Sequence, residues 1–188
     1  MNPTLWRTCR VLSGKTRIEL LRRIVQRPGL SVSDLAGLAR IGLPRASQEL
    51  RRLQSRGLAK AVRDGPVVRY HPVPDPQVPS AEPLLMALFI AFRDAGNRAD
   101  KDIPRIAKAF SQPRRIVMAR ILARGSIDLP ALSRLAHIPR AALFRHLDVL
   151  RRLGFVAKND RKQLVWISVP HPLARRLEQL MCQVPVSS

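Results

Sequence analysis

The chain has 188 residues, of which 34 are lysine or arginine and 13 are aspartate or glutamate, giving a formal net charge of +21. An excess of this size favours polyanionic partners, such as nucleic acid, whatever the fold. Because 46% of the residues are hydrophobic, the chain is expected to fold rather than remain a disordered basic tail, and aromatic residues at 4% provide few platforms for stacking single-stranded bases. The length fits two small domains.

Apolar residues at helical spacing, interrupted by glycine and proline, predict three helices and a hairpin in the first part of the chain. Ser33 is expected to cap the second helix, Gly42 to allow the turn that follows it, and Gly57 to end the third helix. The predicted elements are helices at Thr16–Gln26, Asp34–Arg40 and Pro44–Arg56, then a hairpin of Leu58–Arg63 and Val67–His71 with Asp64-Gly65-Pro66 at its tip.

A proline-rich segment, Pro72–Pro83, follows the hairpin, and its prolines exclude a helix or a central strand. The next helix, Glu82–Ala95, is apolar nearly all round, so it has to be buried on more than one side. We interpret it as filling the space between two domains, and a homodimer contact through Leu84–Phe92 is the alternative. The predicted domains are residues 1–76, a linker with the apolar helix at 77–97, and residues 98–188 with a C-terminal helix.

The second half of the chain repeats the first. Leu30–Leu58 and Ile127–Phe155 align without a gap at an offset of 97 residues, and seven positions are identical, six of them small or apolar and one a glycine. What repeats is therefore a packing pattern, typical of duplicated architecture. The first helices of the two halves align only at an offset of 98. The predicted elements are helices at Arg114–Ala123, from Asp128, at Pro139–Leu153 and at Pro172–Met181, and a hairpin of Phe155–Asn159 and Gln163–Val169 with Asp160-Arg161-Lys162 at its tip.

A helix–turn–helix followed by a two-stranded hairpin is the arrangement of a winged helix, in which the last helix can enter a DNA major groove. Burial of Ala46, Leu50 and Leu53, and of Leu143, Leu147 and Leu150, would turn the remaining side chains of these helices outward. The expected base-reading residues are Arg45, Ser47, Gln48 and Arg51 in the first half and Arg140, Ala141, Phe144 and Arg145 in the second. The expected phosphate contacts in the hairpins are Arg63, Arg69, Lys158, Arg161 and Lys162.

Three segments carry a resemblance to a known family. FRHLDVLRRLGFV (Phe144–Val156) resembles the recognition helix and its exit in ArsR-type winged-helix repressors, and VLSGKTRIELLRRI (Val11–Ile24) and AFSQPRRIVMARIL (Ala109–Leu122) resemble that family's opening helix pair. The resemblance implies a mainly α fold with small β-hairpin wings, here two tandem winged helices joined by a proline-rich linker and an apolar helix. It also implies double-stranded DNA as the partner.

The chain departs from that family at three points. Phe144 replaces the serine usual before the Arg-His pair, and it is interpreted as a packing residue, with a base-stacking wedge as the alternative. The Cys-x-Cys metal pair of the metal sensors is absent, and Cys9 and Cys182 are expected to be buried apolar residues. Family members usually dimerise through terminal helices, whereas this chain joins two units covalently and resembles a single-chain dimer.

The sequence therefore predicts a sequence-specific transcriptional regulator that binds double-stranded DNA as a monomeric pseudo-dimer. It is expected to be cytoplasmic and nucleoid-associated, without an enzyme site, cofactor or metal, and without a membrane span, because the longest apolar run is shorter than the roughly 20 residues a span needs. The alternatives are a protein-interaction scaffold and a sequence-independent nucleoid or RNA-binding protein. Because the two reading helices differ, an asymmetric DNA target is expected.

Overall fold

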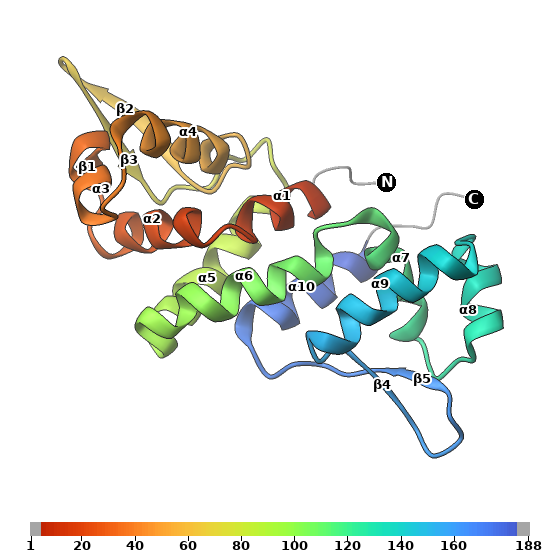
Figure 1. Ribbon diagram of the computed structural model, residues 1–188. Coiled ribbons are helices and arrows are strands. Elements are labelled where there is room, and N and C mark those ends of the chain that lie inside the picture. The colour runs from red at the N-terminus through yellow and green to blue at the C-terminus, as the bar shows by residue number, and fades with distance from the viewer. Residues whose placement is uncertain (1–4, 184–188) are drawn as a thin grey trace. The chain divides into compact units, whose positions relative to one another are not determined.

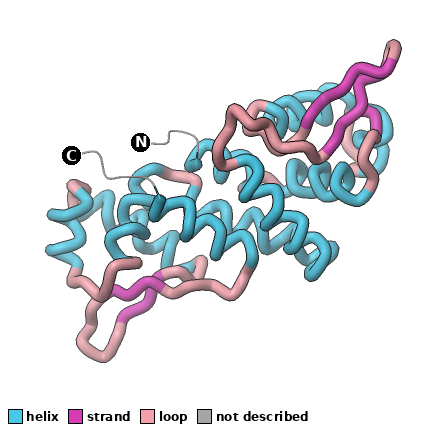
Figure 2. The backbone as a smooth tube through the Cα atoms, turned by 180° about the vertical axis from the view of Figure 1, so that it is seen from behind, coloured by secondary structure: helices cyan, strands magenta, loops and turns pink. Residues whose placement is uncertain are grey.

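The computed structural model describes residues 5–183. The protein is mainly helical, with small antiparallel sheets (Figures 1 and 2), as the sequence predicts at this level. The first half contains α1 (Leu5–Leu12), α2 (Lys15–Gln26), β1 (Leu30–Ser31), α3 (Val32–Leu38), α4 (Leu43–Gln54), β2 (Lys60–Asp64), β3 (Val67–His71) and α5 (Ala81–Ala95). The second half contains a 3₁₀ turn, η1 (Gly96–Arg98), then α6 (Ala99–Phe110), α7 (Pro113–Leu122), α8 (Leu129–Ala136), α9 (Arg140–Arg152), β4 (Val156–Lys158), β5 (Leu164–Trp166) and α10 (Pro172–Gln183).

The chain divides into two compact units, and the division differs from the predicted domain ranges 1–76, 77–97 and 98–188. The first unit is Val11–Pro104, and the described part of the second is residues 5–10 and 105–183. The proline-rich segment lies within the first unit. Its Asp75 N–H donates to the carbonyl of Gly57 at 3.1 Å, and a Cβ on Gly57 would lie 2.9 Å from the Cβ of Asp75. The segment is therefore packed on the end of α4.

The helix ends repeat between the halves at the offset of 97. After α4, Leu58 N–H donates to Leu53 and Gly57 N–H to Gln54, and Phe155 and Gly154 make the corresponding bonds after α9. This is the Schellman arrangement, in which the penultimate residue adopts a left-handed conformation. Both glycines do so, with φ of +69° and +83°. The predicted role of Gly57 as the helix-ending glycine is confirmed.

The turn after α3 was expected at Gly42, and that expectation is wrong. Gly42 has an ordinary extended conformation with φ of −67°, and the left-handed residue is Arg40, with φ of +53°. Its aligned partner in the second half, His137, has φ of +51°. Both residues donate their N–H three residues back, to Gly37 and Arg134 respectively, so the same turn is built twice without glycine.

The N-cap of α3 is Ser31 rather than Ser33, and the helix ends at Leu38 rather than Arg40. The Ser31 hydroxyl accepts from the N–H of Asp34 at 3.1 Å, and the Asp34 carboxylate accepts from the N–H of Ser31 at 2.9 Å. This reciprocal capping box satisfies two amides at once, which Ser33 could not do from inside the first turn. The aligned residue Asp128 caps α8 by accepting from Ala131 N–H at 2.6 Å.

The two sheets have the same plan but different lengths. The first has the strand order β1-β3-β2 and is antiparallel, with Leu30 opposite Tyr70, and its β1 was not predicted. In the second sheet, β4 pairs with β5, and the place of β1 is taken by a single bridge between Ile127 and Leu164. The predicted strands Phe155–Asn159 and Gln163–Val169 are too long. The last paired residues before the tip are Lys158 and Leu164 in the second hairpin and Asp64 and Val67 in the first.

Both opening helix pairs are joined by an arginine. Arg17 Nε donates to the carbonyl of Val11, and Arg115 Nε donates to the carbonyl of Ala109 at 2.9 Å, six residues back in each case. These contacts occupy matching positions at the offset of 98. Of these elements, α1 and the first turns of α6, which contains Pro104, were not predicted from the residue pattern.

Each unit has its own core. In the first, fully buried leucines and isoleucines of α2, α3 and α4 pack together. In the second, Phe110, Phe155 and Trp166 form an aromatic cluster with ring centroids 5.3–6.0 Å apart. The predicted apolar helix is α5, which buries Leu84, Leu88 and Phe92.

Candidate nucleic-acid interface

The first candidate surface is the outer face of α4. Ala46, Leu50 and Leu53 are fully buried, as predicted. The expected reading residues lie on the other side of the helix, where Arg45, Gln48 and Arg51 are exposed and Ser47 is partly exposed. The structure brings these four together, since all of them line one shallow groove that continues past Arg52 to Ser55. Arg45 also donates to the hydroxyl of Thr16 at 3.3 Å, which holds its guanidinium beside α2.

The second candidate surface is the outer face of α9. Leu143, Leu147 and Leu150 are buried as predicted, and Arg140, Ala141, Phe144 and Arg145 are all exposed. Phe144 has 55% of its surface accessible. At the offset of 97, Phe144 aligns with Ser47, Arg145 with Gln48 and Asp148 with Arg51. The two helices therefore share a buried face and differ in the chemistry of the exposed one.

An ion-pair network fixes α4 and was not anticipated from the sequence. Arg17 Nη1 lies 2.7 Å from Glu49 Oε2, and Arg52 Nη1 lies 3.0 Å from Glu49 Oε1. Burial alone would raise the pKa of Glu49, but the hydrogen bond and charge of Arg17, with those of Arg52, outweigh it and hold the pKa below its ordinary value. Glu49 is therefore a positioning residue that sets how α4 sits on α2.

The aligned position in α9 is His146, and its electrostatic environment is the opposite. Burial lowers the pKa of His146, and the positive charges of Arg115, Arg114 and Arg145 lower it further. The Arg115 guanidinium instead bonds the end of α6, donating to Lys108 O at 2.7 Å and to Ser111 Oγ at 2.9 Å. The second helix thus lacks the acidic bridge that holds the first.

Four of the five hairpin cations that were expected to contact phosphates are exposed. They are Arg63, Lys158, Arg161 and Lys162. Arg69 also makes contacts within the protein, because Nε donates to the Asp64 carboxylate at 2.6 Å and Nη1 to the carbonyl of Gly29 at 3.1 Å. Arg69 is therefore occupied within the first sheet, and its charge is offset by Asp64.

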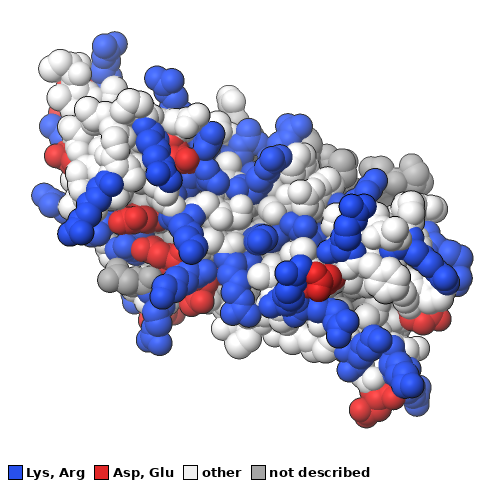
Figure 3. Space-filling model, in the orientation of Figure 1, with Lys and Arg blue, Asp and Glu red and all other residues white. Residues whose placement is uncertain are grey.

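Positive charge is distributed unevenly along the chain. Residues 11–104 hold 16 basic and 9 acidic residues, a formal charge of +7, whereas the remaining 18 basic and 4 acidic residues give +14. Figure 3 shows lysine and arginine side chains over both units, with acidic side chains in a few small groups. The second unit therefore carries the larger net positive charge.

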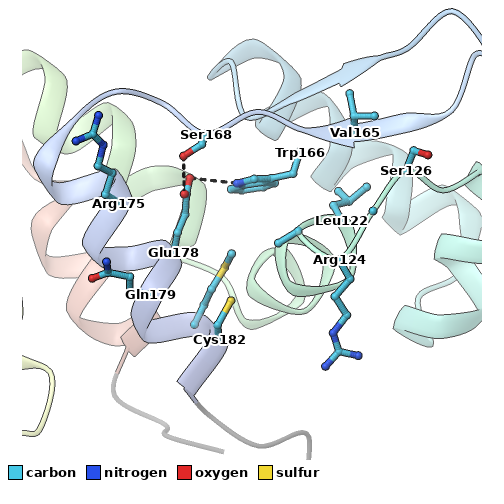
Figure 4. Close-up of a pocket in the computed structure, with 13 residues that line it drawn as sticks. Leu122, Arg124, Ser126, Val165, Trp166, Ser168, Arg175, Glu178, Gln179 and Cys182 are labelled. Atoms are coloured by element: carbon cyan, nitrogen blue, oxygen red, sulfur yellow. Dashed lines mark hydrogen bonds between the residues drawn. The ribbon is translucent and has the colours of Figure 1, made fainter.

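A separate hollow lies among α7, β5 and α10 of the second unit (Figure 4). Here Glu178 accepts from Trp166 Nε1 at 3.1 Å and from Ser168 Oγ at 2.7 Å, so α10 is tied to the aromatic cluster and to the segment just after β5. Cys182 lines the hollow and is exposed, which corrects the expectation that it is buried, whereas Cys9 is fully buried.

Within residues 5–183, no helix is long and apolar enough to cross a membrane, and no group of three His, Cys, Asp or Glu side chains could hold a metal ion. No known protein-family model matches the chain, and no curated protein sequence matches it.

Proposed function

We propose that this protein is a transcriptional regulator that binds double-stranded DNA through two tandem winged-helix units of the ArsR type. In this proposal α4 and α9 are the major-groove helices, and the β2–β3 and β4–β5 hairpins are the wings. The observation that carries it is the repeated placement of one helix, in each half, with its apolar side buried and an arginine-bearing side exposed, directly before a hairpin with exposed cations.

The residues exposed on α4 suit base-edge recognition. Arginine can bond two acceptors of guanine, and glutamine can bond adenine in the same two-point manner. Arg51 and Gln48 lie along one groove on the helix surface, one turn apart. The ion pair between Arg17 and Glu49 supports this role, because a helix that reads bases has to be held firmly against its supporting helix.

The charge supports a duplex partner more than a protein partner. Arg161 and Lys162 lie at the tip of a short hairpin, where cations can reach phosphates. At the offset of 97, the aligned residues of the two helices differ: Ser47, Gln48 and Arg51 correspond to Phe144, Arg145 and Asp148. The two units would therefore read different half-sites. The proposed target is therefore asymmetric, with the chain acting as a monomeric pseudo-dimer.

Selection of duplexes from a random library at physiological salt tests this function. Enrichment of one asymmetric sequence, with competition by that sequence far stronger than by random duplex, is the expected result. Equal competition by random duplex would instead support the alternative of a sequence-independent nucleoid or RNA-binding protein.

A second candidate function, a protein-interaction scaffold, rests on the exposure of apolar side chains in the second unit. Leu135 is 60% and Phe144 55% exposed. Exposed apolar groups of this size are common at protein contacts. A chain that binds no duplex at low salt but forms a stable complex with a protein would favour this alternative.

A further inference from the structure

An apolar groove in the second unit is lined by residues other than those of the exposed face of α9 and the hairpin. Its apolar walls are Val117 and Ile121 of α7, Ile127 in the connection to α8, and Leu135 of α8. Arg120, Arg124, Gly125 and Ser126 complete the lining. The cavity measures about 450 Å³. This is within the range of about 300–1,000 Å³ that small-molecule sites occupy.

The two apolar residues of α7 are specific to the second half. The arginine contacts Arg17 to Val11 and Arg115 to Ala109 fix the offset of 98 between α2 and α7. At that offset, Val117 and Ile121 replace Glu19 and Arg23, which lie 4.0 Å apart as an ion pair on the surface of α2. The same scaffold thus carries a partly exposed ion pair in one half and two partly exposed aliphatic side chains in the other.

Partly exposed aliphatic side chains are unfavourable in water, and a ligand that covered them would recover that free energy. Leu135 extends the same apolar wall and is the most exposed of the large hydrophobic residues described. An apolar occupant of the groove would account for the replacement of Glu19 and Arg23 by Val117 and Ile121.

The charge of the groove indicates the polar group that the ligand must carry in addition to its apolar part. Two arginines and no acidic residue are among the lining side chains. Arg124 is exposed and lines both this groove and the hollow beside Trp166, and Figure 4 shows its side chain in the turn after α7. A guanidinium is well matched to a carboxylate, which it can bond at two points.

We propose that this groove binds an amphipathic carboxylate, with its aliphatic chain against Val117, Ile121, Ile127 and Leu135 and its carboxylate on Arg124. The site shares no residue with the exposed face of α9 or with the hairpins, although Ile127 bridges to Leu164 of β5. It is a ligand site that a regulator of this kind could use, but its existence does not depend on that use.

Titration calorimetry of the full chain with decanoate and with decylammonium, both below their micelle concentrations, tests the proposal. Decanoate should bind with one-to-one stoichiometry, and decylammonium should bind at least tenfold more weakly. Because a basic protein attracts anions everywhere, the decisive variant is Val117→Glu with Ile121→Arg, which restores the first-half pair without changing the net charge. It should weaken decanoate binding roughly tenfold, as expected from loss of contact with about two methylene groups.

Two further comparisons make the result decisive. Arg124→Gln should weaken decanoate binding, whereas Lys101→Gln, an equal change of charge in the first unit, should leave it unchanged. An unaltered circular dichroism spectrum and thermal midpoint would show that the double variant folds. Decanoate binding that survives in a folded Val117→Glu/Ile121→Arg protein, equal binding of both probes, or no binding to the unmodified chain would each overturn the proposal, and none of these results bears on DNA binding.

Discussion

Arg17 and Glu49 form an ion pair of 2.7 Å that joins α2 to α4, and both side chains are largely buried. In the second half the position of Glu49 is taken by His146, beside the positive charge of Arg115. The corresponding helix pairs therefore differ. The interaction between α2 and α4 is attractive, whereas that between α7 and α9 is repulsive once His146 is protonated.

Replacing Glu49 by glutamine should destabilise the first unit. The Arg17 guanidinium would keep its place but lose its charge partner, at a cost of about 2 kcal/mol in the free energy of unfolding. Because the folded pKa of Glu49 is lowered, its contribution is present above the unfolded pKa and is lost as the pH falls through the folded pKa. Hydrogen exchange of the α4 amides measures the effect, with Glu82→Gln on the surface of α5 as the control. Equal protection of α4 in both variants would show that the pair does not hold the helix.

His146 should make the stability of the second unit depend on pH in the same direction as Glu49 does in the first, but in a higher pH range. Its folded pKa is lowered, so the unfolded chain binds the proton more readily, and stability should fall as the pH drops below about 6.5. Both tryptophans, Trp6 and Trp166, belong to this unit, and their fluorescence during urea unfolding reports on it. His146→Gln should reduce the change in the free energy of unfolding between pH 7 and pH 5. An unchanged slope in the variant would assign the effect to other groups.

Gly57 and Gly154 end matching helices and should differ in their tolerance of alanine. Both have positive φ, so alanine costs about 1 kcal/mol of backbone strain at either site. At Gly57 the new Cβ would also meet Asp75 at 2.9 Å and Ala81 at 3.0 Å, whereas at Gly154 the nearest atom belongs to the end of Arg105, 3.8 Å away. Gly57→Ala should therefore cost roughly 1–3 kcal/mol more than Gly154→Ala. Chemical denaturation of the two variants decides the point, and equal losses would mean that the proline-rich segment is not packed on α4.

The sequence predicted the helices that have a regular apolar spacing, and it predicted their buried faces. Burial of one side of a helix places apolar residues three or four positions apart, and this spacing is visible in the sequence. Leu50 and Leu147 are examples. It did not predict the turn at Arg40, because a left-handed arginine has no compositional signal and is held there by the hydrogen bonds of α3. Strand β1 was missed because two residues are too short to show alternation.

For the candidate site, the sequence predicted which side chains are exposed, but it did not predict their hydrogen-bond and ion-pair partners. Arg51 and Phe144 lie outward as their helical positions required. Arg69 was expected to be available because it is a cation in a hairpin, yet its partner Gly29 lies 40 residues away in the chain. The Arg17–Glu49 pair was missed for the same reason, since long-range contacts depend on packing that residue order alone does not specify.

Phe144 should make binding of the second unit sensitive to thymine methyl groups. An exposed phenyl ring on a major-groove helix can contact the methyl group of thymine, which uracil lacks. Replacing thymine by uracil in the selected duplex should weaken binding by the intact chain, and Phe144→Ser, which introduces the residue aligned from the first half, should abolish that difference. A phenylalanine that packs on a protein partner would leave the affinities for the two duplexes equal in both proteins.

The wing cations should act through phosphates and not through sequence. Replacing Arg161 and Lys162 by glutamine should weaken binding to all duplexes to a similar extent and reduce the slope of log affinity against log salt by roughly 1 per residue. Arg51→Ala should instead cost about 1–3 kcal/mol and relax base preference at one position. Affinity measurements on the selected and a scrambled duplex separate the two effects. The same loss of preference from both substitutions would mean that wing and helix do not have these distinct roles.

The salt dependence of binding to one selected duplex is the sharpest test of whether both units contact DNA phosphates. If two units place their cations on the DNA backbone, the affinity of the intact chain should fall steeply and linearly on a log–log scale, with a slope near −0.9 for each phosphate contacted. A slope of about −5 or steeper is expected, because several phosphate contacts from both units contribute. An affinity that hardly changes between low and moderate salt, or no binding at low salt, would contradict the proposed binding.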